Sequence, residues 1–319
     1  MPLPLSARTF VSLVVPCYNE SDAIELFYQG ITPILDALPE IRFEVVCVDD
    51  GSHDDTLARL LTLAVRDARF RIIELSRNFG KEAALTAGID HALGDAVIPM
   101  DADLQDPPEV IHQLIAEWRN GAEVVLGRRV DRSSDSFLKR KTAALFYRLH
   151  NLLSGINVPE DVGDFRLMDR IVVDALRRLP ERQRFMKGLF AWVGFKSVIV
   201  NYARRPRAAG GSKFSGWKLW NFAIEGITSF STAPLKIWTY VGAVGALISF
   251  GYATFIVVRT MVRGVVVPGY ASLLVVVLFL GSLQLISIGV LGEYIGRMYM
   301  ETKTRPTYLV RRQHDNQPK

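Results

Sequence analysis

The chain has 319 residues, enough for one large domain or two. Hydrophobic residues make up 49% of it and its mean hydropathy is +0.18, which is high for a purely water-soluble protein. A net charge of +5 and a pI of about 9.2 favour an anionic partner: nucleic acid, a phosphorylated substrate or an acidic membrane surface. The two cysteines, Cys17 and Cys47, lie in apolar runs and make neither a disulfide framework nor a zinc site.

Short apolar runs alternate with helical patterns in the first part of the chain. We predict strands at residues 10–15, 43–48, 71–75, 97–100 and 123–126. Helices lie between them, the first from Ser21 or Asp22 to about Leu38, with Asp22 and Glu25 spaced like a capping box. Strands that alternate with helices of this length favour a parallel α/β sheet with right-handed crossovers.

The apolar run at 97–100 ends in a cluster of oxygen ligands. Asp101 and Asp103 follow it, then Gln105 and a proline-rich turn. Ligands bind beyond the carboxyl ends of the strands in an open parallel sheet, and alternate residues of an extended segment share a face. Two carboxylates and an amide oxygen suit a divalent cation such as Mg²⁺, which is usually held by one or two carboxylates plus substrate phosphates. Alone, the pattern also fits a strand end capped by turn-forming Asp residues.

Polar residues also follow the ends of the other predicted strands. They are Glu20, Asp50, Lys81 and Arg129. We expect them to gather with the carboxylate pair at one edge of the sheet, because charges scattered over a surface would not fall repeatedly at the ends of strands. The first strand is not followed by G-x-G-x-x-G, which disfavours a dinucleotide-binding Rossmann domain, and the chain has no phosphate-binding P-loop.

Three further stretches carry charge. Residues 128–148 are densely basic and contain aromatic residues, which fits a nucleic-acid patch, a solvated helix face or a surface against an anionic membrane. Residues 161–167 place acids in a glycine-containing turn, and residues 204–213 form a basic loop with two glycines. The remainder of the chain favours the membrane among these alternatives.

Two long apolar segments follow. Residues 237–258 form an uncharged run of 22 residues and residues 271–292 a second run, each long enough to cross a hydrocarbon core of about 30 Å. The flanks are rich in Lys and Arg whereas the connector at 259–270 has only two, so the positive-inside rule places both termini in the cytoplasm. Trp217, Lys218 and Trp220 predict an interfacial helix.

These features predict the following division of the chain. A cytoplasmic catalytic domain occupies residues 1–213 and a juxtamembrane amphipathic helix residues 214–236. Two transmembrane helices at 237–258 and 271–292 flank a periplasmic connector at 259–270, and a cytoplasmic tail occupies 293–319. A metal-binding crevice held at a membrane suggests transfer from a soluble activated donor to a lipid acceptor, in which the cation neutralises a departing diphosphate.

Several motifs resemble those of family 2 glycosyltransferases of the polyprenyl-phosphate type. They stand at residues 16–20, 49–52, 101–105 and 207–213. Stretches at 77–82, 163–168, 216–221, 225–231 and 291–297 resemble the bactoprenol (undecaprenyl-phosphate) glucosyltransferases of O-antigen serotype conversion, which are related to dolichyl-phosphate mannose synthase. The resemblance covers residues 10–312.

The resemblance implies an α/β fold of the GT-A (nucleotide-diphospho-sugar transferase) type and an inverting transfer that depends on Mg²⁺ or Mn²⁺. The donor would be a UDP-sugar, most simply UDP-glucose, and the acceptor undecaprenyl phosphate on the cytoplasmic leaflet of the bacterial inner membrane. A homo-oligomer, such as a tetramer, is also implied, and no nucleic acid is expected as a partner.

The resemblance also assigns roles at matching positions. The nucleotide-sugar site would contain Pro16, Tyr18, Glu20, Asp50, Lys81 and Asp101. The cation would bind Asp101, Asp103 and Gln105. The phosphates of donor and acceptor would be clamped by Arg129, Arg140, Arg207 and Lys213. Asp103 and Asp164 would be catalytic, with Asp164 as the base.

The chemistry of the acceptor points to a different role for Asp164. The second pKa of a phosphomonoester is about 6, so the acceptor oxygen is largely ionised at pH 7. Most acceptor molecules therefore have no proton on the attacking oxygen for a general base to remove. We therefore expect Asp164 to act mainly by orienting an arginine or the metal site.

Alternatives remain open at this point. The same chemistry with another sugar (mannose, galactose, N-acetylhexosamine or aminoarabinose) is an alternative to glucose, and a non-catalytic, membrane-anchored nucleotide-sugar binding protein would keep the crevice. A processive polysaccharide synthase should carry a Gln-x-x-Arg-Trp motif and more membrane spans, which the sequence lacks. A flippase or channel is disfavoured because the two apolar segments contain no ionisable residue.

Overall fold

The computed structural model describes residues 10–130, 162–182, 184, 186–203, 233–263 and 269–314. In the N-terminal part, strands and helices alternate as β1 (Phe10–Cys17), α1 (Ser21–Asp36), β2 (Arg42–Asp49), α2 (Thr56–Arg66), β3 (Phe70–Leu75), α3 (Lys81–His91), β4 (Ala96–Pro99) and α4 (Val110–Arg119). β1 pairs with β2 and β4, and β2 with β3, all in parallel. The alternation of apolar strand segments with helical segments in the sequence therefore predicts this half of the sheet correctly.

The second part of the domain departs from the prediction of an all-parallel sheet. Its elements are β5 (Val124–Arg129), β6 (Val162–Asp169), α6 (Arg170–Arg177), α7 (Met186–Trp192) and β7 (Ser197–Tyr202). The segment 161–167, predicted as a turn, lies almost wholly in β6, which runs antiparallel between β4 and β5. The acids and glycine of this segment resemble a turn in sequence, but the segment is a strand with apolar residues buried on both faces. Phe165 and Leu167 are buried on one face, and Val162 and Met168 on the other.

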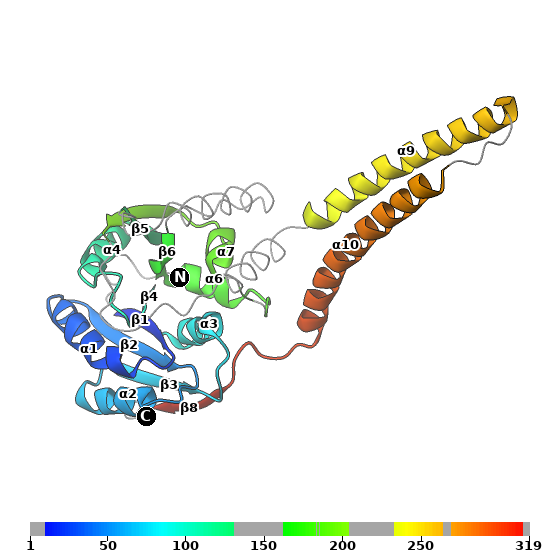
Figure 1. Cartoon of the computed structure of the whole chain (residues 1–319). Helices are drawn as coiled ribbons and strands as arrows, with labels where there is room; N and C mark the ends of the chain where they lie inside the picture. The colour runs from blue at the N-terminus through cyan, green and yellow to red at the C-terminus, as the bar shows by residue number, and fades with distance from the viewer. Residues whose placement is uncertain are drawn as a thin grey trace.

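The complete sheet is mixed and has eight strands in the order β7-β5-β6-β4-β1-β2-β3-β8, with β8 (Val310–His314) at one edge. Helices cover both faces (Figure 1). Residues of α1, α2 and α4 pack into one hydrophobic cluster, and residues of α3, α6 and α7 into the other. Neighbouring β1 residues divide between the clusters, because successive side chains of a strand point to opposite faces.

The capping box predicted at the start of α1 is wrong. The helix begins at Ser21, its N-cap residue is Glu20, and the cap makes no side-chain hydrogen bond. Asp22 therefore lies inside the first turn, where a carboxylate interacts favourably with the positive end of the helix macrodipole. The entry to α1 is held instead by the backbone N–H of Glu20, which donates to Thr56 Oγ1 at 2.9 Å.

A buried polar network lies at the end of the sheet away from the predicted site. Glu44 accepts hydrogen bonds from Ser12 Oγ at 2.5 Å and from the backbone N–H of Leu93 at 2.6 Å. Arg71 Nη1 donates to Glu44 Oε2 at 2.6 Å. All three side chains are buried. A buried ion pair of this kind is tolerated only when its hydrogen bonds are made, so the network fixes the alignment of β1, β2 and β3.

Two long helices extend away from the sheet and lie along each other (Figure 1). They are α9 (Ala233–Arg263) and α10 (Tyr270–Thr302). Within the described residues, Phe279–Thr302 has the length and apolar composition to cross a membrane, and Tyr240–Tyr252 is a shorter apolar stretch. Many large apolar side chains on both helices are exposed, including Leu247, Phe250 and Leu285 at more than 70%. Exposure on this scale marks a surface that meets a membrane or a partner.

The segment after α10 returns to the sheet. β8 pairs antiparallel with β3, and Glu74 of β3 lies 3.1 Å from Arg311 Nη1 and 3.6 Å from His314 Nε2. Tyr308 donates from its hydroxyl to Asp90 Oδ2 at 3.0 Å. The predicted cytoplasmic tail thus contributes an edge strand, which polar spacing alone did not indicate.

Candidate active site

The site forms where polar side chains follow the strands of the parallel half of the sheet. Lys81 opens α3, directly after the loop that leaves β3. Its Nζ lies 2.6 Å from Asp101 Oδ1, just beyond β4, and 3.1 Å from Asp164 Oδ2 on β6. One ammonium therefore bridges two carboxylates from different strands. The predicted gathering of strand-end residues is confirmed for Lys81 and Asp101, whereas Asp164 was predicted to lie in a turn.

Asp164 is a strongly ionised carboxylate. Burial raises its pKa, but the positive charges of Lys81, Lys187 and Arg166 outweigh that effect and lower the pKa to about 2. Its Oδ1 is buried, and within the described part of the chain no hydrogen-bond partner reaches it. A buried carboxylate oxygen in this state is suited to a cation or a hydrogen-bond donor supplied by a ligand.

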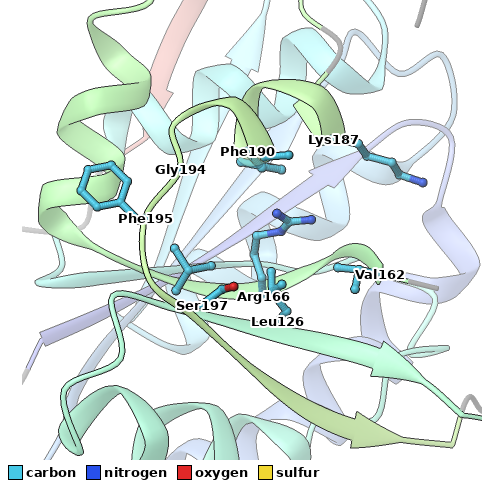
Figure 2. Close-up of a pocket in the computed structure, with 10 residues that line it drawn as sticks. Leu126, Val162, Arg166, Lys187, Phe190, Gly194, Phe195 and Ser197 are labelled. Carbon is cyan, nitrogen blue, oxygen red and sulfur yellow. The ribbon is translucent and has the colours of Figure 1, made fainter. Parts of the chain in front are cut away.

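Arg166 lies two residues beyond Asp164, on the same face of β6. Its Nη2 donates to the carbonyl of Gly163 at 2.7 Å, and its guanidinium carbon lies 4.1 Å from the centre of the Phe190 ring. Figure 2 shows this side chain rising from the sheet toward α7, in a cavity of about 100 Å³ whose lining also includes Lys187. Arg166 thus supplies a fixed positive charge behind the carboxylate.

Glu82 is a second acid next to this trio. Its Oε2 accepts a hydrogen bond from the backbone N–H of Met186 at 3.2 Å, which ties α3 to α7. Burial, and then the charge of Asp164, raise the pKa of Glu82 to about 7. Glu82, Arg166 and Lys187 were not among the predicted site residues, although Glu82 and Arg166 fall inside stretches that carry the family resemblance.

The loop after β3 is held by Asp50. Its two carboxylate oxygens accept the backbone N–H groups of Phe79 at 2.7 Å and Gly80 at 2.9 Å. Gly80 has φ +100°, a conformation that side chains disfavour, so glycine is suited to the step into α3. Burial raises the pKa of Asp50, while these two N–H groups oppose the shift. Asp50 therefore positions Lys81.

Asp103 and Gln105 lie in a tight loop after β4. The backbone N–H of Gln105 donates to Asp103 Oδ1 at 3.2 Å. Leu104 between them has φ +53°, which is uncommon outside glycine, and its side chain fits against Gly30, where an added Cβ would lie 2.8 Å from Leu104 Cδ1. Backbone held in a sparsely populated region is found at ligand sites more often than elsewhere.

The oxygen donors at this edge suit a divalent cation whose coordination shell is completed by oxygen atoms of the substrate. Within the described ranges, no three His, Cys, Asp or Glu side chains are placed to hold a metal ion on their own. Asp101 and Asp103 supply two carboxylates, and Mg²⁺ commonly binds one or two carboxylates together with substrate phosphates and waters. The roles predicted for Asp101, Asp103 and Gln105 stay predictions.

Arg129 is placed beside the site by a polar cluster. Its Nη2 lies 3.4 Å from Asp106 Oδ1, and its Nε donates to the hydroxyl of Tyr202 at 3.2 Å. Tyr202 in turn donates to Asp106 Oδ1 at 2.5 Å. An added Cβ on Gly163 would lie 2.9 Å from Arg129 Nη2, so the guanidinium lies against the strand that carries Asp164. Asp106 and Tyr202 were not predicted.

The remaining predicted residues divide into two groups. Pro16 is the last residue but one of β1, Tyr18 makes an edge contact with the His53 ring at 6.5 Å between centres, and Glu20 is the N-cap residue of α1. These three lie at the end of β1 and just after it, and Tyr18 contacts the loop that follows β2. Arg140, Arg207 and Lys213, and the interfacial helix around Trp217, lie outside the described residues.

Comparison with known proteins identifies the family. The model for glycosyl transferase family 2 matches residues 12–177. The chain belongs to this family. The GT-A type of α/β fold that the sequence predicts is therefore confirmed, and the protein is a glycosyltransferase. A second model, the GtrB C-terminal hairpin, matches residues 233–298, which include all of α9 and most of α10.

This family 2 glycosyltransferase has similar relatives over nearly its whole length. It is 54% identical to the bactoprenol glucosyl transferase of Shigella phage SfII over 308 residues, 97% of this chain and 99% of the relative. It is 52% identical to an uncharacterized glycosyltransferase of Synechocystis, over 94% of each chain. Among solved structures, glucosyl-3-phosphoglycerate synthase of Mycobacterium tuberculosis with Mn²⁺, UDP-glucose and phosphoglyceric acid is 19% identical, with a TM-score of 0.47, over 70% of this chain and 78% of that one.

Proposed function

We propose that this glycosyltransferase moves glucose from UDP-glucose to undecaprenyl phosphate, with inversion at the sugar carbon. The lipid-linked glucose would serve as donor for the modification of a cell-surface glycan such as O-antigen. The observation that carries the proposal is the 54% identity to a bactoprenol glucosyl transferase over 97% of the chain. The hairpin match supports a lipid acceptor, because it gives the catalytic domain a membrane association.

In this proposal Asp101, Asp103 and Gln105 hold Mg²⁺ or Mn²⁺ together with the donor diphosphate. The bound cation would neutralise the charge that develops on the departing UDP. Lys81 contributes a second positive charge at the same edge, since its ammonium already lies against Asp101. The nucleotide would occupy the crevice at the ends of β1 and β2, next to Tyr18 and Glu20.

Asp164 acts by positioning rather than by taking a proton. A carboxylate with a pKa of about 2 is a weak base near neutral pH. The acceptor phosphate is already largely ionised at pH 7, because its second pKa is about 6. The contact of Asp164 with Lys81 at 3.1 Å keeps the ammonium beside the sugar site. Arg129, Arg140, Arg207 and Lys213 would hold the phosphates of donor and acceptor.

We further propose that the protein lies in the bacterial inner membrane with two spans, the catalytic domain and both termini in the cytoplasm, and that it forms a homo-oligomer. The exposed apolar surface of α9 and α10 supports this placement, since it needs a membrane or neighbouring helices to cover it. Protease protection and cysteine labelling of the connector and of the C-terminus in membrane vesicles would test the topology.

The direct test of the reaction uses membranes that contain the full chain. They are incubated with undecaprenyl phosphate and a panel of radiolabelled UDP-sugars, and the glycolipid is identified. We expect a glucosyl lipid whose formation needs Mg²⁺ or Mn²⁺ and falls sharply in Asp103→Ala at a metal concentration that saturates the parent. Labelling from another UDP-sugar would correct the sugar, and no labelling from any of them would refute the function.

A further inference from the structure

A pocket beside the active site is lined by two arginines that have no role in the site described above. It is a cavity of about 260 Å³ between the start of α3, the segment before α7 and the segment after α10. Lys81 and Glu82 line it from α3, Arg182 and Arg184 from the segment before α7, and Thr307 from the chain beyond α10. Because it opens next to Lys81, a ligand bound there would lie close to the reacting groups.

The two arginines are held by carbonyl oxygens, which leave their charge in place. Arg184 donates from Nε to the carbonyl of Glu181 at 3.1 Å and from Nη2 to that of Leu179 at 2.9 Å. Arg182 Nη1 donates to the carbonyl of Arg305 at 2.5 Å. A carbonyl satisfies an N–H without neutralising a guanidinium, and a guanidinium has five donors, so each arginine keeps charge and donors for an anion.

The walls of the pocket are fixed by contacts with their neighbours. Asp50 holds Gly80 through the backbone N–H. Glu82 binds the backbone of Met186, two residues beyond Arg184. The backbone N–H of Arg182 donates to Glu301 Oε1 near the end of α10 at 3.0 Å. A binding site that is formed before its ligand arrives loses less conformational entropy on binding.

Glu82 reduces the positive charge of the pocket only in part. Burial and the neighbouring Asp164 raise its pKa to about 7, so near neutral pH a large share of this carboxyl is protonated. A protonated carboxyl is also a hydrogen-bond donor. The lining as a whole therefore favours an anion with several acceptor oxygens.

We propose that Arg182 and Arg184, together with Lys81, form a binding pocket for a phosphate group of a substrate. Planar guanidinium groups match phosphate oxygens in bidentate geometry, and the hydroxyl of Thr307 adds a donor. This inference rests on the proposed function, which brings two sources of phosphate: the diphosphate of the sugar donor and the monophosphate of the lipid. Because Thr307 and Arg305 follow α10, the pocket is complete only when the segment after the hairpin packs on the catalytic domain.

Equilibrium binding to the full chain in detergent micelles tests the proposal with two probes, UDP and farnesyl phosphate. Arg184→Gln and Arg182→Gln are compared with Arg119→Gln, a control in the last turn of α4 whose partner Glu40 is also exposed. We expect Kd for at least one probe to rise about tenfold or more in Arg184→Gln, as for the loss of a charged hydrogen bond, and to stay unchanged in the control. A rise for UDP alone identifies the donor phosphate, and a rise for farnesyl phosphate alone identifies the acceptor phosphate.

Arg184→Lys keeps the charge, and we expect it to recover part of the affinity lost in Arg184→Gln. Thermal unfolding confirms that each variant is folded before its Kd is read. The proposal is overturned if folded Arg184→Gln binds both probes within twofold of the parent, or if the parent binds neither. Since binding is measured without turnover, a chain that binds through these arginines but makes no glucosyl lipid would contradict the proposed function alone.

Discussion

Replacing Asp164 by asparagine separates a positioning role from that of a general base. The side chain keeps its shape but loses the charge that faces Lys81 at 3.1 Å. The pKa of about 2 lies below the ordinary value for aspartate, which corresponds to a net stabilisation of the carboxylate on the order of 2–3 kcal/mol. If that interaction supports the reacting geometry, kcat should fall about 100-fold.

The shape of the pH–rate profile decides between the two roles, because a base can contribute a loss of similar size, about 10²–10⁴-fold. Asp164 has a depressed pKa, so it remains ionised as pH falls until about pH 2. We therefore expect initial rates of glucosyl-lipid formation from pH 5 to 9 to be lowered by a constant factor in Asp164→Asn. Asp22→Asn, an exposed carboxylate on α1, should match the parent.

A steep acid limb in the parent that disappears in Asp164→Asn would refute the reasoning. A double-mutant cycle with Lys81→Met adds an independent check. If the ion pair is the functional unit, the double variant should lose little more activity than the worse single variant. Additive losses would show that the two residues act separately.

Three other predictions concern metal, stability and pH. Asp103→Ala should raise the Mn²⁺ concentration needed for half-maximal activity, and an unchanged metal dependence would contradict its assignment. Glu44→Gln leaves the buried Arg71 without its counter-charge and should lower the free energy of unfolding by about 3–5 kcal/mol. This corresponds to a fall in Tm of roughly 6–20 °C, measured by scanning fluorimetry of the full chain. A fall below about 2 °C would contradict the stabilising role of the network. Glu82→Gln should stabilise the protein increasingly as pH rises from about 4.5 to 7, since a carboxyl whose pKa is raised to about 7 loses its contribution to stability over that range. A Tm difference that stays constant with pH would contradict this.

The parallel half of the sheet is predictable from sequence because each of its strands is an apolar run that ends in a polar turn. The same rule brings Lys81 and Asp101 together, since the carboxyl ends of parallel strands meet at one edge. For Asp164 the rule fails. Its strand is antiparallel and interrupted by Gly163 and Arg166, so the sequence pattern indicates a turn.

Contacts that join distant segments were also beyond the sequence. Glu82 and Arg166 become visible as site residues only when α3, β6 and α7 are packed together. The pairing of β8 with β3 links residues more than two hundred positions apart, and nothing in the spacing of the tail specifies its partner. Sequence patterns report the period of each element, whereas these contacts depend on tertiary packing.

The return of the chain from α10 to the edge of the sheet makes the hairpin an insertion within the catalytic domain rather than an appendage. β8 lies on β3, and β3 leads directly into the loop that ends at Lys81. α10 is therefore connected to the ammonium of Lys81 through one strand pair and one short loop. Under the membrane placement proposed above, a change in the tilt of α10 would be transmitted along this connection to Lys81.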